Sequence, residues 1–311
     1  SSRVSFIGNW SYPLCSLIAM GLTPLISAEW NWRVQLLIPA ILSLIATALA
    51  WRYFPESPRW LESRGRYQEA EKVMRSIEEG VIRQTGKPLP PVVIADDGKA
   101  PQAVPYSALL TGVLLKRVIL GSCVLIAMNV VQYTLINWLP TIFMTQGINL
   151  KDSIVLNTMS MFGAPFGIFI AMLVMDKIPR KTMGVGLLIL IAVLGYIYSL
   201  QTSMLLITLI GFFLITFVYM YVCYASAVYV PEIWPTEAKL RGSGLANAVG
   251  RISGIAAPYA VAVLLSSYGV TGVFILLGAV SIVVAIAIAT IGIETKGVSV
   301  ESLSIDAVAN K

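Results

Sequence analysis

An arginine inside a long apolar stretch is the residue of this chain best suited to hold a charged ligand. Arg251 lies about nine residues, or roughly 13 Å of helix rise, into an apolar segment over 242–266. A guanidinium at that depth is costly unless it faces a wet cavity or a partner, and its planar fork matches a carboxylate. We therefore expect Arg251 to bind an anionic group. The alternatives are that it extends to the cytoplasmic interface or pairs with Glu232.

Side chains with hydrogen-bonding groups gather in an earlier apolar segment, over 117–143. Residues at i, i+1 and i+5 can share a broad helix face, so Gln132, Tyr133 and Asn137 are predicted to line a cavity. Asn129 lies about one turn before Gln132 and belongs to the same set. The alternative is that these polar groups hydrogen-bond neighbouring helices together.

Aromatic side chains offer a further ligand surface. Tyr221 and Tyr224 are three residues apart, so they can present rings and hydroxyls on one face to a small aromatic or polyol ligand. Packing between helices is an equally good reading of both. Trp10, inside an apolar segment over 5–26, is also expected at the cavity.

The chemistry of catalysis is poorly represented in this sequence. The chain has no histidine, and Cys15, Cys123 and Cys223 all fall inside apolar segments, where we expect them to pack as small apolar residues. We predict no metal site and no cofactor. A membrane-embedded enzyme would need a nucleophile with a base, or a metal site, within these segments, and the segments contain no histidine and no paired acids.

The elements that must position these residues are long apolar helices. The 311 residues are 57% hydrophobic and 12% charged, with a mean hydropathy of +0.79. A helix crosses a bilayer with about 20 apolar residues, and lipid requires backbone groups to be satisfied within the helix. We therefore predict an all-α polytopic membrane protein with eight spans, over 5–26, 33–54, 117–143, 153–175, 183–202, 204–230, 242–266 and 270–292.

Charge placement orients these spans. Of the 22 Lys and Arg residues, all except Arg33, Lys151 and Arg251 fall in loops or termini on one side. By the positive-inside rule that side is cytoplasmic, so both termini and the long central loop are expected there. The net charge of +6 and the pI near 9.2 reflect these Lys and Arg residues of the cytoplasmic side. They give no reason to expect a nucleic-acid partner.

The domain boundaries follow from the same pattern. We expect two spans in 1–54, a cytoplasmic loop over 55–116, six spans in 117–292 and a cytoplasmic tail over 293–311. Within the loop, Ser57 and Pro58 favour a helix start, and an amphipathic helix is predicted to follow it, before a proline-rich linker.

Four charged motifs on the predicted cytoplasmic side resemble the major facilitator superfamily, and in particular its sugar porter, organic ion transporter and metabolite:proton symporter branches. The motifs are Pro55-Glu56-Ser57-Pro58-Arg59, Asp176-Lys177-Ile178-Pro179-Arg180-Lys181, Pro231-Glu232-Ile233-Trp234-Pro235-Thr236 leading to Arg241, and Glu294-Thr295-Lys296-Gly297. The resemblance covers the whole chain and matches helices five to twelve of a twelve-helix pattern. It implies that four helices precede this sequence.

The resemblance also implies a function and a set of gating residues. It implies two six-helix bundles that rock about a central substrate site, in a bacterial inner membrane. The residues expected to form a cytoplasmic gate are Glu56, Arg59, Asp176, Arg180, Glu232 and Arg241. Their alternative role is only to fix loop geometry.

The expected substrate is a small polar metabolite, and Arg251 favours an organic or aromatic carboxylate. Val131 stands where sugar porters carry a second glutamine, which disfavours a sugar; a sugar, an organic cation, or a truncated remnant without transport remain the alternatives. The resemblance implies a proton as coupling ion. Because no acidic residue lies at the centre of a predicted span, we expect the titrating carboxylate in the preceding helices.

Overall fold

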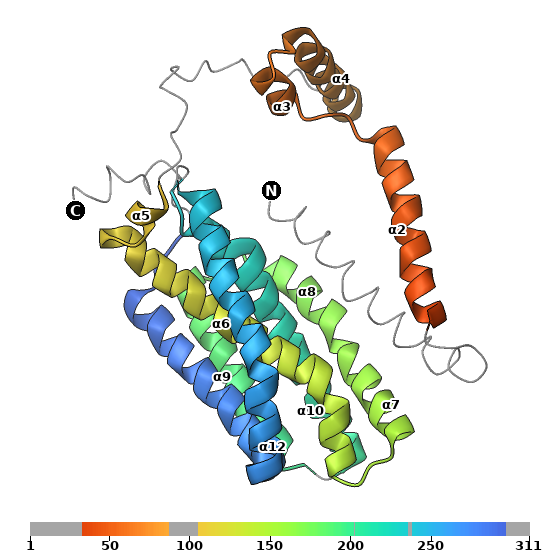
Figure 1. The fold of residues 1–311 in the computed structure, drawn as a ribbon, viewed down its shortest axis with the longest axis vertical. Coiled ribbons are helices and arrows are strands. Elements are labelled where there is room, and N and C mark those ends of the chain that lie inside the picture. Colours follow the sequence, from red (N-terminus) through yellow and green to blue (C-terminus); the bar gives the residue numbers. More distant parts are fainter. Residues whose placement is uncertain (1–32, 87–104, 202, 236–237, 297–311) are drawn as a thin grey trace. The chain divides into compact units, whose positions relative to one another are not determined.

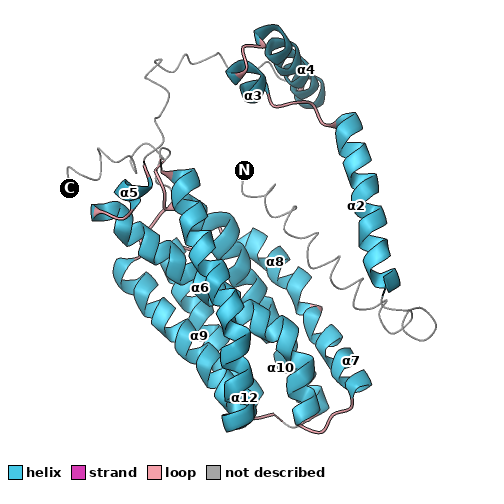
Figure 2. Ribbon diagram, viewed as in Figure 1, coloured by secondary structure: helices cyan, strands magenta, loops and turns pink. Residues whose placement is uncertain are grey.

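The computed structural model describes residues 33–86, 105–201, 203–235 and 238–296, and every regular element in these ranges is a helix (Figures 1 and 2). The described residues fall into two units, 33–86 and 105–296, and each is considered by itself.

The first unit contains three helices. Helix α2 (Arg33–Tyr53) coincides with the predicted span over 33–54. Helix α3 (Pro58–Ser63) begins at Pro58, as the Ser57-Pro58 pair predicts, and α4 (Tyr67–Thr85) is the predicted amphipathic helix. Leu61 of α3 is 2% exposed, so the short helix is anchored by this apolar side chain.

The second unit is a helical bundle. It begins with α5 (Tyr106–Leu109) and α6 (Gly112–Thr145), continues through α7 (Leu150–Met161), α8 (Gly163–Val174) and α9 (Arg180–Ser199), and ends with α10 (Met204–Val222), η1 (Cys223–Tyr229), α11 (Val230–Glu232) and α12 (Lys239–Ile291). Among the residues searched, five helical segments are long and apolar enough to cross a membrane: Gly112–Thr145, Leu150–Val174, Arg180–Ser199, Met204–Glu232 and Lys239–Ile291.

These five segments contain six of the predicted spans, because two spans share α12. At Gly269 the backbone has φ 65° and ψ −160°, a conformation that residues with a Cβ rarely adopt. Figure 1 shows α12 as two lengths of helix that run in opposite directions. The predicted spans over 242–266 and 270–292 are therefore two helices joined at one glycine.

Two glycines of α8 bring it against α10. A Cβ on Gly163 would lie 2.2 Å from the Phe212 carbonyl oxygen, and one on Gly167 would lie 2.2 Å from the carbonyl oxygen of Thr216. No larger residue fits at either position without moving a backbone. Close packing of small residues is typical of helices in membranes.

Candidate functional site

A cavity of about 240 Å³ lies within the bundle. Its lining combines apolar and polar side chains from α6, α8, α10, η1 and α12: Met128, Asn129, Gln132, Tyr133, Ile168, Tyr219, Val222, Cys223, Ser226 and Arg251. Among these lining residues there is one cation and no carboxylate. The cavity therefore has a net positive charge in the part of the chain that the structure describes.

Small residues on α12 set its distance from α6. A Cβ on Gly250 would lie 2.8 Å from the Leu125 Cβ, and a Cβ on Gly254 would lie 3.2 Å from the ring of Tyr133. The glycines are four residues apart and so share one helix face. This close approach places the next residue, Arg251, beside the polar face of α6.

Arg251 makes one side-chain hydrogen bond across this interface. Its Nη1 donates to the Tyr133 hydroxyl oxygen at 2.6 Å, and the Arg251 side chain is otherwise exposed. A guanidinium has five N–H donors, so this bond leaves most of them available. The predicted alternative in which Arg251 pairs with Glu232 is not what the structure shows, since Glu232 bonds to Arg180.

The structure brings together four of the eight residues predicted to bind substrate. Asn129, Gln132, Tyr133 and Arg251 all line the cavity. Asn137 is exposed and lies outside the lining.

Tyr221 and Tyr224 also lie outside the lining. Tyr221 is 1% exposed and donates its hydroxyl to the Val124 carbonyl at 3.1 Å, while Tyr224 is 0% exposed and stacks on Tyr229 with ring centroids 5.0 Å apart. These contacts favour the packing alternative for both tyrosines. Trp10 falls outside the described residues.

Six cavity residues were not predicted: Met128 on α6, Ile168 on α8, and four from the end of α10 and from η1. Tyr219, Val222, Cys223 and Ser226 are spaced i, i+3, i+4 and i+7, which marks one helix face. That spacing, with Ser226 as its polar member, was the available sequence signal. The π-helical turns of η1, which sequence reasoning does not reveal, occur frequently at functional sites.

A second polar centre surrounds Arg180 at the start of α9. The Arg180 side chain is 7% exposed, and its Nε and Nη2 donate to the two carboxylate oxygens of Glu232 at 3.1 and 3.2 Å. Arg180 also donates to the Met175 carbonyl and lies 3.6 Å from an Asp176 oxygen. Three of the predicted gating residues, Asp176, Arg180 and Glu232, thus form one charged cluster.

Glu294 binds the N-terminus of α9 from the far end of the chain. Its carboxylate accepts the backbone N–H groups of Arg180 at 2.8 Å and Lys181 at 3.1 Å, and also that of Lys296 at 3.1 Å. Burial alone would raise the pKa of the Glu294 carboxyl, but these donors outweigh it and the pKa is lowered. The neighbouring Thr295 hydroxyl donates to Glu232 at 2.6 Å, which ties this segment to the Arg180 cluster.

The other predicted gating residues lie elsewhere. The Arg241 guanidinium lies 5.2 Å from the centre of the Tyr106 ring, a cation–π contact. In the first unit, Glu56 is exposed, and the Arg59 side chain is outside the described residues.

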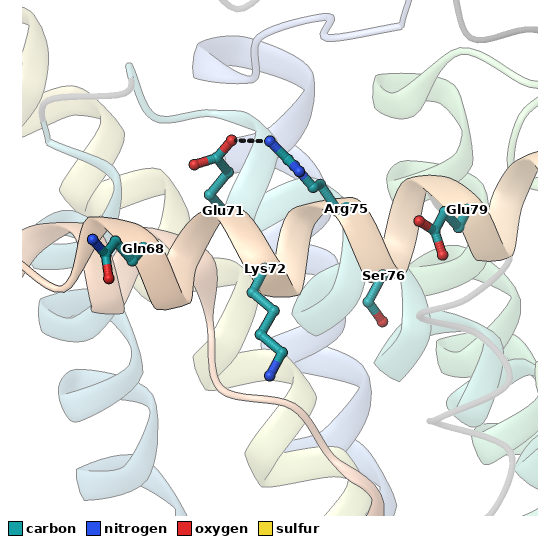
Figure 3. Close-up of a pocket in the computed structure, with 6 residues that line it drawn as sticks. All are labelled: Gln68, Glu71, Lys72, Arg75, Ser76 and Glu79. Atoms are coloured by element: carbon teal, nitrogen blue, oxygen red, sulfur yellow. Dashed lines mark hydrogen bonds and ion pairs between the residues drawn. The ribbon is translucent and has the colours of Figure 1, made fainter.

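A shallow polar surface on α4 does not form a comparable site. Figure 3 shows its residues along a single helix: Gln68, Glu71, Lys72, Arg75, Ser76 and Glu79. The dashed line joins Arg75 to Glu71, an exposed i, i+4 ion pair at 2.6 Å. Such a pair contributes about 0.3–0.5 kcal/mol, so this surface is a solvated helix face.

The amino-acid sequence is similar to transport proteins. Residues 10–307 match the family described as "Sugar (and other) transporter". The inner membrane metabolite transport protein YdjE of Escherichia coli (strain K12) is 44% identical over 306 residues, which are 98% of this chain and 67% of the relative. The niacin transporter NiaP of Acinetobacter baylyi is 25% identical over 290 residues, 93% of this chain and 65% of that protein.

The fold is similar to that of a solved major facilitator protein. The proton:xylose symporter XylE bound to 6-bromo-6-deoxy-D-glucose has a TM-score of 0.65 and 20% sequence identity, over 97% of this chain and 66% of that one. The chain thus spans about two thirds of the length of the proteins it matches. Family membership confirms the expectation of a multi-pass membrane transporter rather than an enzyme, and the fold is that of the solved major facilitator protein. The chain belongs to the sugar (and other) transporter family.

Proposed function

We propose that this chain is part of a secondary carrier that binds an organic or aromatic carboxylate at Arg251. The observation that carries the proposal is the charge of the cavity. Arg251 is exposed there and bonds to a neutral hydroxyl, and the described lining has no carboxylate to neutralise it. A guanidinium stays charged at any physiological pH, so a ligand carboxylate is the complement it lacks.

The name of one relative supports this substrate class. Niacin, for which NiaP is named, is a pyridine carboxylic acid. The cavity of this chain also offers Tyr219 and apolar side chains, including Met128 and Ile168, to a flat ring. A sugar is the second candidate, supported by the xylose symporter fold and by Gln132 in the lining. An organic cation is disfavoured by the positive charge of Arg251.

Competition binding to the purified chain in lipid nanodiscs tests this proposal. Labelled benzoate should be displaced by carboxylates and not by D-xylose, and Arg251→Gln should weaken benzoate binding by about 10- to 100-fold, because a hydrogen bond to a charged group contributes about 1.5–3 kcal/mol. Gln132→Ala is the matched change in the same cavity and should affect benzoate less. If the chain instead binds D-xylose, and Gln132→Ala weakens that binding, the substrate is a sugar and not a carboxylate.

The Arg180 cluster is our proposal for the cytoplasmic gate. Asp176, Arg180 and Glu232 join the start of α9 to α11, so separating these segments must break charged hydrogen bonds. A barrier of this kind can hold one state of a rocking carrier until substrate binds. Arg241, Glu56 and Arg59 remain proposed members of the gate on the strength of their motifs.

The membrane arrangement is proposed as follows. Residues 1–54 are two helices of an N-terminal bundle, 55–116 a cytoplasmic loop, 117–292 a six-helix bundle and 293–311 a cytoplasmic tail, giving eight of twelve helices. The positive-inside rule supports cytoplasmic termini, and the name of YdjE supports a bacterial inner membrane. A proton is the proposed coupling ion, and its carboxylate is expected outside the described cavity.

A further inference from the structure

We propose that Tyr133 is a second substrate-binding residue, whose hydroxyl donates a hydrogen bond to the same carboxylate that Arg251 binds. This inference rests on the proposed function and extends it, because it predicts how the site distinguishes an acid from its neutral amide. It depends on the direction of one hydrogen bond, on the position of the Tyr133 ring and on the composition of the cavity lining.

The hydrogen bond between the two residues fixes which groups are left for a ligand. Arg251 has only donors, so in the 2.6 Å contact the Tyr133 oxygen must be the acceptor. The Tyr133 hydroxyl keeps its own proton, and that proton meets no acceptor among the described residues. The hydroxyl and the guanidinium therefore present two kinds of donor to the same cavity.

The charge of Arg251 makes the Tyr133 hydroxyl a better donor. Accepting a bond from a guanidinium draws electron density from the phenol oxygen, and hydrogen bonds in such chains strengthen one another in a low-dielectric site. An anionic oxygen gains most from a polarised O–H donor. A carboxylate oxygen can accept from Tyr133 while its partner oxygen accepts from Arg251.

The ring of Tyr133 is held in place by the surface of α12. Gly254 lies directly against it, since a Cβ there would be 3.2 Å from two ring carbons. Asn129, on the same face of α6, is fixed by its bond to the Leu125 carbonyl at 2.8 Å. Because the ring packs against backbone, the hydroxyl can keep its direction when a ligand enters the cavity.

The test compares benzoate with benzamide, which have the same ring and differ in charge. Affinities are measured by calorimetry on the full chain in nanodiscs for the unsubstituted protein, Tyr133→Phe, Gly254→Ala and Arg251→Gln. Tyr133→Phe keeps the ring and removes the hydroxyl, and should weaken benzoate binding by about tenfold and benzamide binding by less. Tyr196→Phe, which removes an exposed phenol of α9 outside the cavity, is the matched control and should change neither.

Gly254→Ala keeps the test decisive if Tyr133→Phe fails to fold. The added methyl displaces the ring by a few tenths of an ångström, so the preference for benzoate over benzamide should fall by a smaller factor. Gly244→Ala, on the same helix and with open space at its Cβ, should leave the preference unchanged.

Three results would overturn the role of Tyr133: an unchanged preference in both variants, tighter benzoate binding in Tyr133→Phe, or equal weakening of both ligands. If Arg251→Gln still removes the preference for benzoate in those cases, the proposed function stands and only the role of Tyr133 fails. The proposed function itself fails if Arg251→Gln also binds both ligands as the unsubstituted protein does. It fails too if the unsubstituted protein binds no benzoate.

Discussion

Two arginines of the same bundle have opposite surroundings. Arg180 is 7% exposed and donates to Glu232 and to a backbone carbonyl, with Asp176 also nearby. Arg251 is exposed, faces a cavity, and donates to a neutral tyrosine. The first charge is compensated within the protein, and the second is not compensated by any side chain that lines its cavity in the described structure.

The difference indicates what each residue can do. Removing Arg180 takes the charged partner from Glu232, and solvent screens only part of that cost because the Glu232 side chain is 36% exposed. A guanidinium held by one neutral hydroxyl has further N–H donors available, so Arg251 can bind a carboxylate without breaking its bond to Tyr133. We therefore expect Arg180 to control stability and conformation, and Arg251 to control binding.

The largest expected effect is on stability and separates these two roles. Arg180→Met should lower the free energy of unfolding by about 1.5–3 kcal/mol, since it removes the charged hydrogen bonds to Glu232 and leaves that carboxylate with the Thr295 hydroxyl. Arg251→Met removes the same charge from the cavity and should change stability by less than about 0.5 kcal/mol. Thermal unfolding of both variants in the same detergent gives the comparison. Equal losses would show that the two arginines are not distinguished by their surroundings.

The next effect concerns the packing that positions Arg251. Gly250→Ala places a methyl group 2.8 Å from the Leu125 Cβ, and overpacking of this kind costs about 1–3 kcal/mol. It should lower both the unfolding temperature and benzoate affinity. Gly244→Ala, with no atom near its Cβ, should do neither. If the two variants behave alike, the approach of α12 to α6 does not control the site.

The sequence predicts the helices well because the bilayer constrains them strongly. A run of about 20 apolar residues has few alternatives to a membrane helix, and α9 and α10 begin within three residues of their predicted starts at 183 and 204. The turn at Gly269 was also placed correctly between two spans. The sequence does not show that the last two spans are separated by a single non-helical residue, Gly269.

The site is only partly predictable, since it depends on which faces of the helices meet. Arg251 and Gln132 were found because polar groups in apolar helices are costly. Tyr221 and Tyr224 were favoured because residues three apart can present rings and hydroxyls on one helix face, but buried contacts outside the cavity hold them. Helix periodicity alone does not indicate which face of a helix lines the cavity. It also does not identify Glu232, 52 positions away in the sequence, as the partner of Arg180.

A smaller effect, on pH dependence, sharpens the description of the Arg180 end. Glu294 has an ordinary pKa of 4.5, which its backbone donors lower in the folded protein. A lowered carboxyl pKa contributes stability above the unfolded value, and this contribution is lost as the pH falls through the folded value. The unsubstituted chain should therefore lose stability below about pH 4.5, by about 0.3–1 kcal/mol for a carboxylate at a helix N-terminus.

The Glu294→Gln variant gives the control for that effect. It keeps the size of the side chain but cannot titrate, so it should be less stable than the unsubstituted chain at pH 7 and should approach it in acid. Thermal unfolding measured at several pH values makes the comparison. Parallel curves at every pH would mean that Glu294 does not bind the start of α9 as a carboxylate.

The smallest expected effect on stability tests the gate most directly. Asp176 lies 3.6 Å from Arg180 and is 54% exposed, so Asp176→Asn should change stability by only about 0–1 kcal/mol. An equilibrium between two carrier states is more sensitive, because about 1 kcal/mol changes their ratio about fivefold. Labelling of a Ser226→Cys cavity thiol from the proposed cytoplasmic side should therefore become faster in Asp176→Asn and stay constant in Asp152→Asn, which removes a carboxylate from the first turn of α7. Unchanged labelling and transport would mean that the Arg180 cluster has only a structural role. Arg180 would then control stability alone, while Arg251 controls binding.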